Sequence, residues 1–146
     1  MPEPKHIFLV DDDIDDRLLL QEALNEVAPQ VKLSLADGCD MLVKLSKVGF
    51  EKPDFIMLDL NMPGLNGFEC LEEIMNREHL GNVPVIIYST TANPEHVKKT
   101  YNKGACLYMQ KPSSYEGIKK LMNKVLLIDL KDYTPLAVKE NLVLSA

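Results

Sequence analysis

Five acidic residues stand within six positions near the N-terminus, directly after the apolar run of residues 7–10. They are Asp11, Asp12, Asp13, Asp15 and Asp16. Carboxylates crowded into a partly dry cleft repel one another, and a divalent cation relieves that repulsion. Mg²⁺ in proteins is typically held by one or two carboxylates, several waters and a phosphate oxygen. Asp11 and Asp12, at the end of the run, are therefore candidate Mg²⁺ ligands.

The other three acids of this cluster have a simpler interpretation. An aspartate can cap the start of a helix, and acids in the first turn interact favourably with the helix dipole. Apolar residues at helical spacing begin at Leu18 and stop before Pro29. We therefore predict a helix after the acids, with Asp13 or Asp15 as its N-cap and Asp16 on a solvated surface.

A single aspartate, Asp59, follows a second apolar run, residues 55–58. An aspartate at a strand end beside a metal can attack phosphorus and form an aspartyl phosphate. Asn61 stands two positions later, and its backbone carbonyl is a further candidate metal ligand. A capping role is the simpler alternative for Asp59, but the neighbouring acids favour the chemical role.

Two more apolar runs are followed by polar residues; these runs are residues 85–88 and 106–109. Ser89 could donate its hydroxyl to a phosphate oxygen, although Thr90 beside it leaves the choice of hydroxyl open on spacing alone. Lys111 could supply positive charge to a phosphoryl group or to Asp59, because phosphoryl transfer depends mainly on positioning and electrostatics. A lone lysine is usually a surface residue, but Pro112 constrains the backbone here.

The apolar runs and the segments between them predict alternating strands and helices. Unbroken apolar runs of four or five residues are typical of strands buried on both faces of a parallel sheet. The segment 31–36 alternates apolar and polar residues instead, which favours an edge strand. Apolar residues at helical spacing occupy the remaining segments. They are 18–27, 41–48, 68–75, 94–103 and 118–126.

A strand followed by a helix, repeated five times, predicts an α/β fold with one doubly wound, five-stranded parallel sheet and helices on both faces. In such sheets, ligands bind beyond the carboxyl ends of the strands. Polar residues come directly or closely after the predicted strands. They are Asp11, Asp12, Asp59, Ser89 and Lys111. We expect the fold to bring these side chains together at one edge.

Length and composition fit one soluble domain. The chain has 146 residues, of which 46% are hydrophobic and 26% charged, enough for a core without disulfides. Cys39, Cys70 and Cys106 match neither a disulfide framework nor a metal site. No signal peptide or membrane-spanning run is present, so we expect a reducing cytoplasmic location without membrane contact. The net charge of -6 argues against binding of nucleic acid.

Four motifs in this order resemble the receiver domain of two-component response regulators, of the chemotaxis-regulator-like, stand-alone type. They are Val10-Asp11-Asp12, Asp59-Leu60-Asn61-Met62-Pro63 with Gly67, Ser89-Thr90, and Lys111-Pro112. The resemblance covers residues 5–128 and implies a flavodoxin-like fold with strand order 2-1-3-4-5. It also implies Mg²⁺-dependent phosphorylation by a sensor histidine kinase or a histidine phosphotransfer protein, followed by a conformational switch toward a downstream protein target.

The resemblance assigns a role to the residues around the expected metal. Asp59 is the expected phosphoacceptor, Asp12 a direct Mg²⁺ ligand, and Asp11 a ligand acting largely through water. The Asn61 carbonyl is expected to bind the metal, and Asn61 and Thr91 occupy positions that tune dephosphorylation. The implied activity is self-phosphorylation and autodephosphorylation of one chain, and not the turnover of an enzyme.

The resemblance also assigns the residues that would bind the phosphoryl group and respond to it. Ser89 is the expected switch hydroxyl, Thr90 would direct its backbone N–H to the phosphoryl oxygens, and Lys111 would bind them directly. Pro112 stands at an expected cis-proline position. Tyr108 is the expected switch aromatic, which turns inward when the hydroxyl moves.

Residues 129–146 form a C-terminal tail after the receiver-like region, and no output domain is expected there. Pro135 predicts a break in any helix of this tail. Its apolar residues are numerous enough to pack on the domain itself or on a partner, and the sequence leaves both open.

Positive charge concentrates in residues 98–124, which hold seven lysines and one acid, Glu116. These residues cover the predicted fourth and fifth helices. We hypothesise that they form a basic face used for output or for homodimer formation. An ordinary solvated, lysine-rich face is the alternative.

Two other functions are compatible with parts of the sequence. A phosphatase of the haloacid dehalogenase type would use Asp11 as its nucleophile in an Asp-x-Asp pattern with Asp13, but it leaves Asp59 without a role. A pseudo-receiver would bind partners without accepting phosphate. The site of phosphate labelling distinguishes these alternatives.

Overall fold

The computed structural model describes residues 6–38, 40–45, 51–61, 66–80 and 82–146. Three features of the sequence analysis lie outside these residues, namely Cys39, the predicted end of the second helix, and Met62-Pro63 of the Asp59 motif. In the described part of the chain, no helix is both long and apolar enough to cross a membrane.

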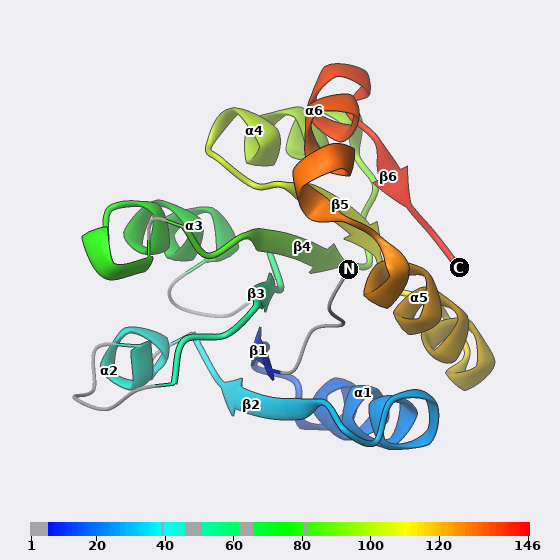
Figure 1. Ribbon diagram of the computed structural model, residues 1–146. Helices are drawn as coiled ribbons and strands as arrows, with labels where there is room; N and C mark the ends of the chain where they lie inside the picture. Colours follow the sequence, from blue (N-terminus) through cyan, green and yellow to red (C-terminus); the bar gives the residue numbers. More distant parts are fainter. Residues whose placement is uncertain (1–5, 39, 46–50, 62–65, 81) are drawn as a thin grey trace.

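In the described residues, six parallel strands form one sheet in the order β2-β1-β3-β4-β5-β6 (Figure 1). The strands are β1 His6–Val10, β2 Lys32–Ala36, β3 Phe55–Leu58, β4 Val85–Ser89, β5 Leu107–Gln110 and β6 Val143–Leu144. The predicted α/β class is confirmed, and so is the order 2-1-3-4-5 for the first five strands. The sheet has one strand more than predicted because β6 pairs with β5.

Helices cover both faces of this sheet. They are α1 Ile14–Val27, α2 Met41–Leu45, α3 Gly67–Met75, α4 Pro94–Asn102, α5 Tyr115–Leu127, α6 Leu130–Glu140 and the short 3₁₀ helix η1 Glu78–Leu80. Figure 1 shows α1 and α5 side by side on one face and α2, α3 and α4 on the other. The doubly wound arrangement that the alternation of elements predicted is therefore present.

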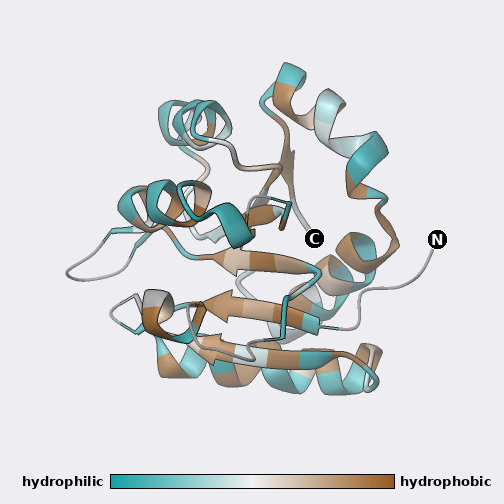
Figure 2. Cartoon of the chain, turned by 60° about the vertical axis from the view of Figure 1, so that its left-hand side comes forward, coloured by the Kyte–Doolittle hydropathy of each residue, from teal (hydrophilic) through white to brown (hydrophobic). Residues whose placement is uncertain are grey.

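The burial of the strands matches their central or edge positions in the sheet. Every residue of β1, β3 and β4 is buried, whereas four of the five residues of β2 are exposed or partly exposed. Unbroken apolar strands pack centrally because helices cover both of their faces, and an alternating strand can lie at an edge. Figure 2 shows the same contrast, with hydrophobic residues concentrated on the central strands. The edge position predicted for residues 31–36 is confirmed.

The first helix begins where the acid cluster predicted. Asp13 is the N-cap of α1, and its Oδ1 accepts a hydrogen bond from the backbone N–H of Asp16 at 3.0 Å. This bond satisfies a backbone donor that has no partner within the helix. The short link from β1 to α1 therefore fixes the start of the helix directly beside the carboxyl end of the strand.

The prediction that Pro135 breaks any helix in the tail is wrong, because α6 runs through it. Proline removes a single helical N–H donor. The helix is stabilised at its start by the Asp129 cap, and its Ala137 side chain is fully buried. Asn141 then ends α6 in the left-handed conformation, with φ 48°, and leads into β6. The tail thus contacts its own domain.

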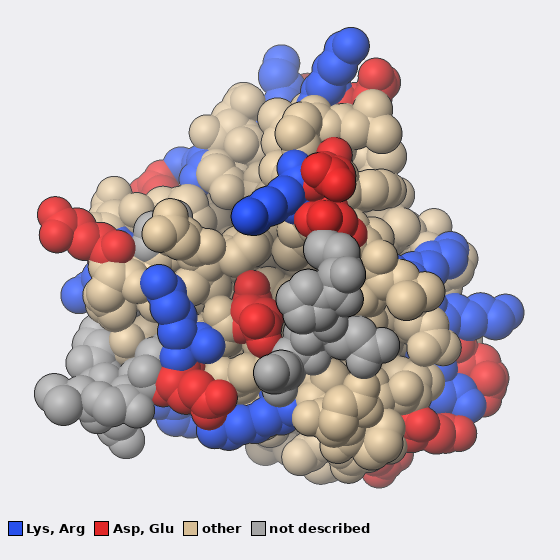
Figure 3. All heavy atoms as spheres, in the orientation of Figure 1, with Lys and Arg blue, Asp and Glu red and all other residues tan. Residues whose placement is uncertain are grey.

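Acids of other helices lie beside two lysines of residues 98–124. Lys103, the C-cap residue of α4, forms an ion pair with Glu72 of α3, and Lys119 of α5 forms one with Glu26 of α1 at 3.1 Å. Another of the seven lysines is buried at the strand ends. The face drawn in Figure 3 carries positive and negative side chains interspersed. Local pairing therefore offsets part of the charge that the sequence concentrates in this region.

Candidate functional site

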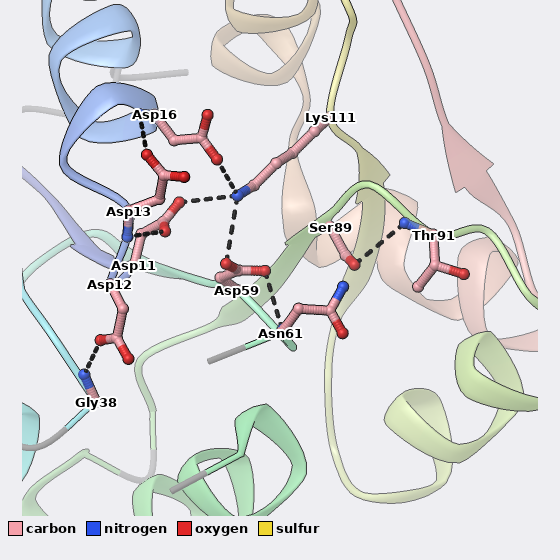
Figure 4. A network of polar contacts seen from close by, with 10 residues as sticks. All are labelled: Asp11, Asp12, Asp13, Asp16, Gly38, Asp59, Asn61, Ser89, Thr91 and Lys111. Carbon is pink, nitrogen blue, oxygen red and sulfur yellow. Dashed lines mark hydrogen bonds and ion pairs between the residues drawn. The ribbon is translucent and has the colours of Figure 1, made fainter. Parts of the chain in front are cut away.

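The polar residues that end the strands lie together at one edge of the sheet (Figure 4). Asp11 follows β1, Asp59 follows β3, Ser89 is the last residue of β4, and Lys111 follows β5. Parallel strands all place their carboxyl ends at the same edge, so the predicted convergence of these residues is a consequence of the topology.

Lys111 is the centre of this cluster. Its ammonium nitrogen Nζ donates to Asp16 Oδ2 at 2.8 Å, to Asp11 Oδ2 at 2.9 Å and to Asp59 Oδ2 at 3.3 Å. The Lys111 side chain is only 7% exposed. Burial alone would lower the pKa of Lys111, but the three carboxylates raise it above its ordinary value. The lysine is therefore a fixed positive charge between acids from three parts of the chain.

Asp59 is buried, and its carboxylate is held at both oxygens. Oδ1 accepts a hydrogen bond from the backbone N–H of Asn61 at 3.1 Å, and Oδ2 accepts from Lys111. Burial raises the pKa of Asp59 to about 6; the Lys111 charge opposes this rise and the Asp11 charge adds to it. The carboxylate is therefore mostly ionised at neutral pH, in surroundings that favour additional positive charge.

Close packing fixes the chain just beyond Asp59. The backbone N–H of Gly67, the first residue of α3, donates to the Leu60 carbonyl at 3.1 Å. A Cβ atom at Gly67 would lie 2.3 Å from Leu60 Cα and 2.6 Å from the Asp59 carbonyl oxygen. Only glycine fits at this distance, so α3 starts directly against the strand end that carries Asp59.

The two neighbouring acids differ in orientation. Asp11 is fully buried, and its Oδ1 accepts from the backbone N–H of Asp13 at 3.0 Å. Asp12 Oδ1 accepts from the backbone N–H of Gly38 at 2.7 Å, and Figure 4 shows its side chain directed away from Lys111. Within the described residues, no three acidic, histidine or cysteine side chains form a ready metal site.

The donor set nevertheless fits a hard cation in its chemistry. Asp11 and Asp59 present carboxylate oxygens at the strand ends, Asp12 stands next to Asp11, and Asn61 supplies a carbonyl two positions after Asp59. Three carboxylates share the single Lys111 ammonium, so negative charge at the strand ends is not fully compensated. Oxygen donors and surplus negative charge are what Mg²⁺ requires.

Ser89 and Tyr108 are connected through Thr91. Ser89 is buried, and its Oγ accepts a hydrogen bond from the Thr91 N–H at 3.3 Å. Tyr108 is also fully buried, and its hydroxyl donates to the Thr91 carbonyl at 2.7 Å. The aromatic side chain that was expected to turn inward thus lies inside. Thr90 is exposed, and its carbonyl accepts from Gln110 Nε2 at 3.3 Å.

The cis peptide bond expected before Pro112 is not present: no peptide bond among the described residues is cis. The trans form is the lower-energy isomer of a bond before proline. The Lys111 N–H donates to the Ser89 carbonyl at 2.7 Å and continues the β4–β5 pairing. With this trans bond, the Lys111 ammonium already reaches Asp59.

Asp16 is a site residue that the sequence analysis missed. It was assigned to a solvated helix surface, but its Oδ2 lies 2.8 Å from Lys111 Nζ. The available signal was its position in the first turn of α1, a helix that begins at the strand end carrying Asp11. Charge pattern alone could not reveal the contact, because Lys111 is 95 positions away in the sequence.

The sequence is similar to known signalling proteins. The chain is 32% identical over 134 residues to the two-component response regulator ARR17 of Arabidopsis thaliana, covering 83% of this chain and 84% of that one. It is also 32% identical over 127 residues to the response regulator Rcp1 of Synechocystis sp., with 84% and 86% covered.

Solved structures of the same kind share the fold. The phosphorylated cyanobacterial phytochrome response regulator RcpA has a TM-score of 0.74 and 29% identity, covering 83% of this chain and 90% of that one. The Mn²⁺-bound form of the response regulator Rcp1 has a TM-score of 0.71 and 26% identity, with 86% and 97% covered. The profile of the response regulator receiver domain matches residues 7–123. The chain therefore belongs to the response regulator receiver domain family of two-component signalling.

Proposed function

We propose that Asp59 accepts a phosphoryl group from a histidine kinase or a histidine phosphotransfer protein. One observation carries this assignment: the Asp59 carboxylate is buried at the end of β3, with the Lys111 ammonium 3.3 Å from its Oδ2. A carboxylate nucleophile beside a fixed positive charge is the arrangement that phosphoryl transfer to an aspartate needs.

The transfer joins one Asp59 carboxylate oxygen to phosphorus while the bond from phosphorus to the donor breaks. The leaving group keeps the bonding electrons. Charge on the transferred oxygens then lies near Lys111, which offsets it. Small acyl phosphates can serve as donors in the same way, so we infer self-phosphorylation. Attack of water on the acyl phosphate returns Asp59, and we infer that Asn61 and Thr91 affect that rate.

Mg²⁺ is the proposed cofactor. Asp11, Asp12, Asp59 and the Asn61 carbonyl would hold it, and the bound ion would neutralise negative charge on the phosphoryl oxygens. The surplus of carboxylates around Lys111 supports this, and Rcp1 has been solved with Mn²⁺ bound. Because Asp12 now accepts from Gly38, binding the metal through this carboxylate requires its side chain to turn.

We infer that Ser89, Thr90 and Lys111 bind the phosphoryl oxygens and that Tyr108 responds to the phosphorylation of Asp59. Thr91 supports this inference, because its N–H is bonded to Ser89 and its carbonyl to Tyr108. A movement of Ser89 toward Asp59 would alter both bonds. A local charge change at one strand end can in this way shift a neighbouring loop and helix.

The proposed partners are the phosphodonor, a downstream protein target and a second copy of the chain bound through α4 and α5. The tail bears on the last of these, since β6 pairs with β5 and Tyr101 of α4 donates a hydrogen bond to the Leu142 carbonyl just before β6. Part of the surface between α4 and α5 is thus covered by the chain itself. Cys70 and Cys106 are buried and not in disulfides, which is compatible with the reducing cytoplasm.

The test is labelling with acetyl phosphate in the presence of Mg²⁺, followed by peptide mapping by mass spectrometry. We expect the wild-type chain to gain one phosphoryl group at Asp59 and Asp59→Asn to gain none. Asp132→Asn, at an exposed carboxylate of α6, serves as the control and should be labelled normally. Chelation of Mg²⁺ should abolish labelling.

Two results would contradict the proposal. A phosphoryl group mapped to Asp11 would indicate chemistry of the haloacid dehalogenase type. No labelling of the wild type by acetyl phosphate or by any histidine phosphotransfer donor, in a protein that still binds Mg²⁺, would indicate a pseudo-receiver.

A further inference from the structure

Asp16 shares the Lys111 ammonium with the two carboxylates at the strand ends. The distances from Lys111 Nζ are 2.8 Å to Asp16, 2.9 Å to Asp11 and 3.3 Å to Asp59. A lysine ammonium has three N–H donors. The three carboxylates therefore use all of them, and Asp16 has the shortest of the three bonds.

A phosphoryl group on Asp59 requires one of these donors. A phosphoryl group carries more negative charge than the carboxylate that it modifies, so it attracts the ammonium more strongly. Asp11 is fully buried, and an unpaired carboxylate there would be costly. The Asp16 side chain is 36% exposed, so water can replace Lys111 as its partner. Asp16 is the partner that Lys111 can leave most easily.

We propose that Asp16 is a positioning residue that restrains Lys111 before phosphorylation and releases it to the phosphoryl group afterwards. This inference rests on the proposed function of Asp59. When acetyl phosphate is the donor, the bond between phosphorus and the acetyl oxygen breaks, the bond from phosphorus to Asp59 forms, and acetate leaves with the electron pair. Asp16 takes no part in these bond changes, so removing its charge frees Lys111 and speeds the transfer.

A matched pair of substitutions separates this contact from a general charge effect. Asp16→Asn removes the charge and keeps the shape of the side chain. Asp15→Asn makes the same change at the other acid of the first turn of α1, whose side chain is exposed. We expect acetyl phosphate with Mg²⁺ to label Asp16→Asn about fivefold faster than Asp15→Asn, the scale of one partly exposed ion pair.

A spectroscopic measurement on the unphosphorylated protein tests the restraint itself. The side-chain ammonium of Lys111 should give a slowly exchanging NMR signal in the wild type and in Asp15→Asn, because all of its donors are bonded. We expect faster exchange with water in Asp16→Asn and recovery of the wild-type behaviour in Asp16→Glu, which restores the carboxylate. A purely structural role of Asp16 would change stability without changing this signal.

Two outcomes would overturn the role of Asp16: a labelling rate of Asp16→Asn equal to or below that of Asp15→Asn, or an unchanged Lys111 signal in Asp16→Asn. Both leave the labelling of wild-type Asp59 intact. A wild-type chain that takes up no phosphoryl group would overturn the proposed function, and this inference with it.

Discussion

Three carboxylates share one ammonium at the carboxyl ends of the strands. Asp11, Asp16 and Asp59 lie within 3.3 Å of Lys111 Nζ, so the local charge stays negative after the lysine is counted. The two most buried acids repel each other at close range. Burial, with a smaller contribution from the Asp11 charge, raises the pKa of Asp59 above that of an ordinary aspartate. The surplus of carboxylates makes the site attractive to a further cation.

The raised pKa of Asp59 predicts that its ionised form destabilises the metal-free protein. The folded state holds the Asp59 proton up to a pKa of about 6, whereas the unfolded chain loses it near 3.8. The contribution of Asp59 to stability therefore falls as pH rises from about 4 to 6. We expect Asp59→Asn to raise the free energy of unfolding at pH 7 by about 1–3 kcal/mol, with the gain fading by pH 4.

Urea denaturation in the presence of a chelator measures this difference at both pH values. Asp132→Asn, at an exposed carboxylate, is the control and should change the free energy of unfolding by less than about 0.5 kcal/mol. A loss of stability in Asp59→Asn at pH 7 would show that the Lys111 pair outweighs the burial of the charge.

One tyrosine hydroxyl connects a helix, a central strand and the tail. Tyr101 of α4 accepts a hydrogen bond from the backbone N–H of Tyr108 in β5 at 3.0 Å and donates to the Leu142 carbonyl at 2.6 Å. Burial raises the pKa of Tyr101 to about 12, so the hydroxyl keeps its proton. The hydrogen bond from the Tyr108 N–H satisfies a buried backbone donor, and Tyr108 is also the proposed switch aromatic.

Tyr101→Phe removes both bonds and leaves the buried Tyr108 N–H without its partner. We expect it to lower the free energy of unfolding by about 1–3 kcal/mol, the usual cost of an unsatisfied buried polar group. Tyr115→Phe is the matched control, because its hydroxyl bonds Glu26 at an exposed position, and it should cost less than about 1 kcal/mol. Equal losses in the two variants, measured by urea denaturation, would argue against this bridge.

The elements differ in how far the sequence predicts them. Apolar runs predict β1, β3, β4 and β5 because burial on both faces leaves no polar position, and alternation predicts β2. The helix through Pro135 could not be predicted locally, because the packing of Ala137 and the cap at Asp129 stabilise it. Strand β6 has only two residues, and its pairing with β5 depends on where α6 directs the chain.

The site residues likewise differ in how far the sequence predicts them. Polar residues at strand ends were predictable because topology alone brings Asp11, Asp59 and Lys111 to one edge. The orientation of Asp12 toward Gly38 and the contact of Asp16 with Lys111 depend on side-chain directions after folding. Spacing along the chain carries no signal for either. The strand-end residues to which we assign the reaction were thus easier to identify than the contacts that Asp12 and Asp16 make around them.

At the scale of the whole molecule, the tail is predicted to unfold together with the receiver fold. Ala137 of α6 is fully buried, whereas its neighbour Val138 is 41% exposed. Ala137→Asp would bury an unpaired carboxylate, and we expect it to lower the free energy of unfolding by about 2–4 kcal/mol in a single transition. Val138→Asp, with the same added charge, should cost less than about 1 kcal/mol. Urea denaturation followed by circular dichroism and by tyrosine fluorescence measures both variants. A separate early transition, or an unchanged main transition in Ala137→Asp, would show that α6 and β6 detach from a receiver fold that is stable without them.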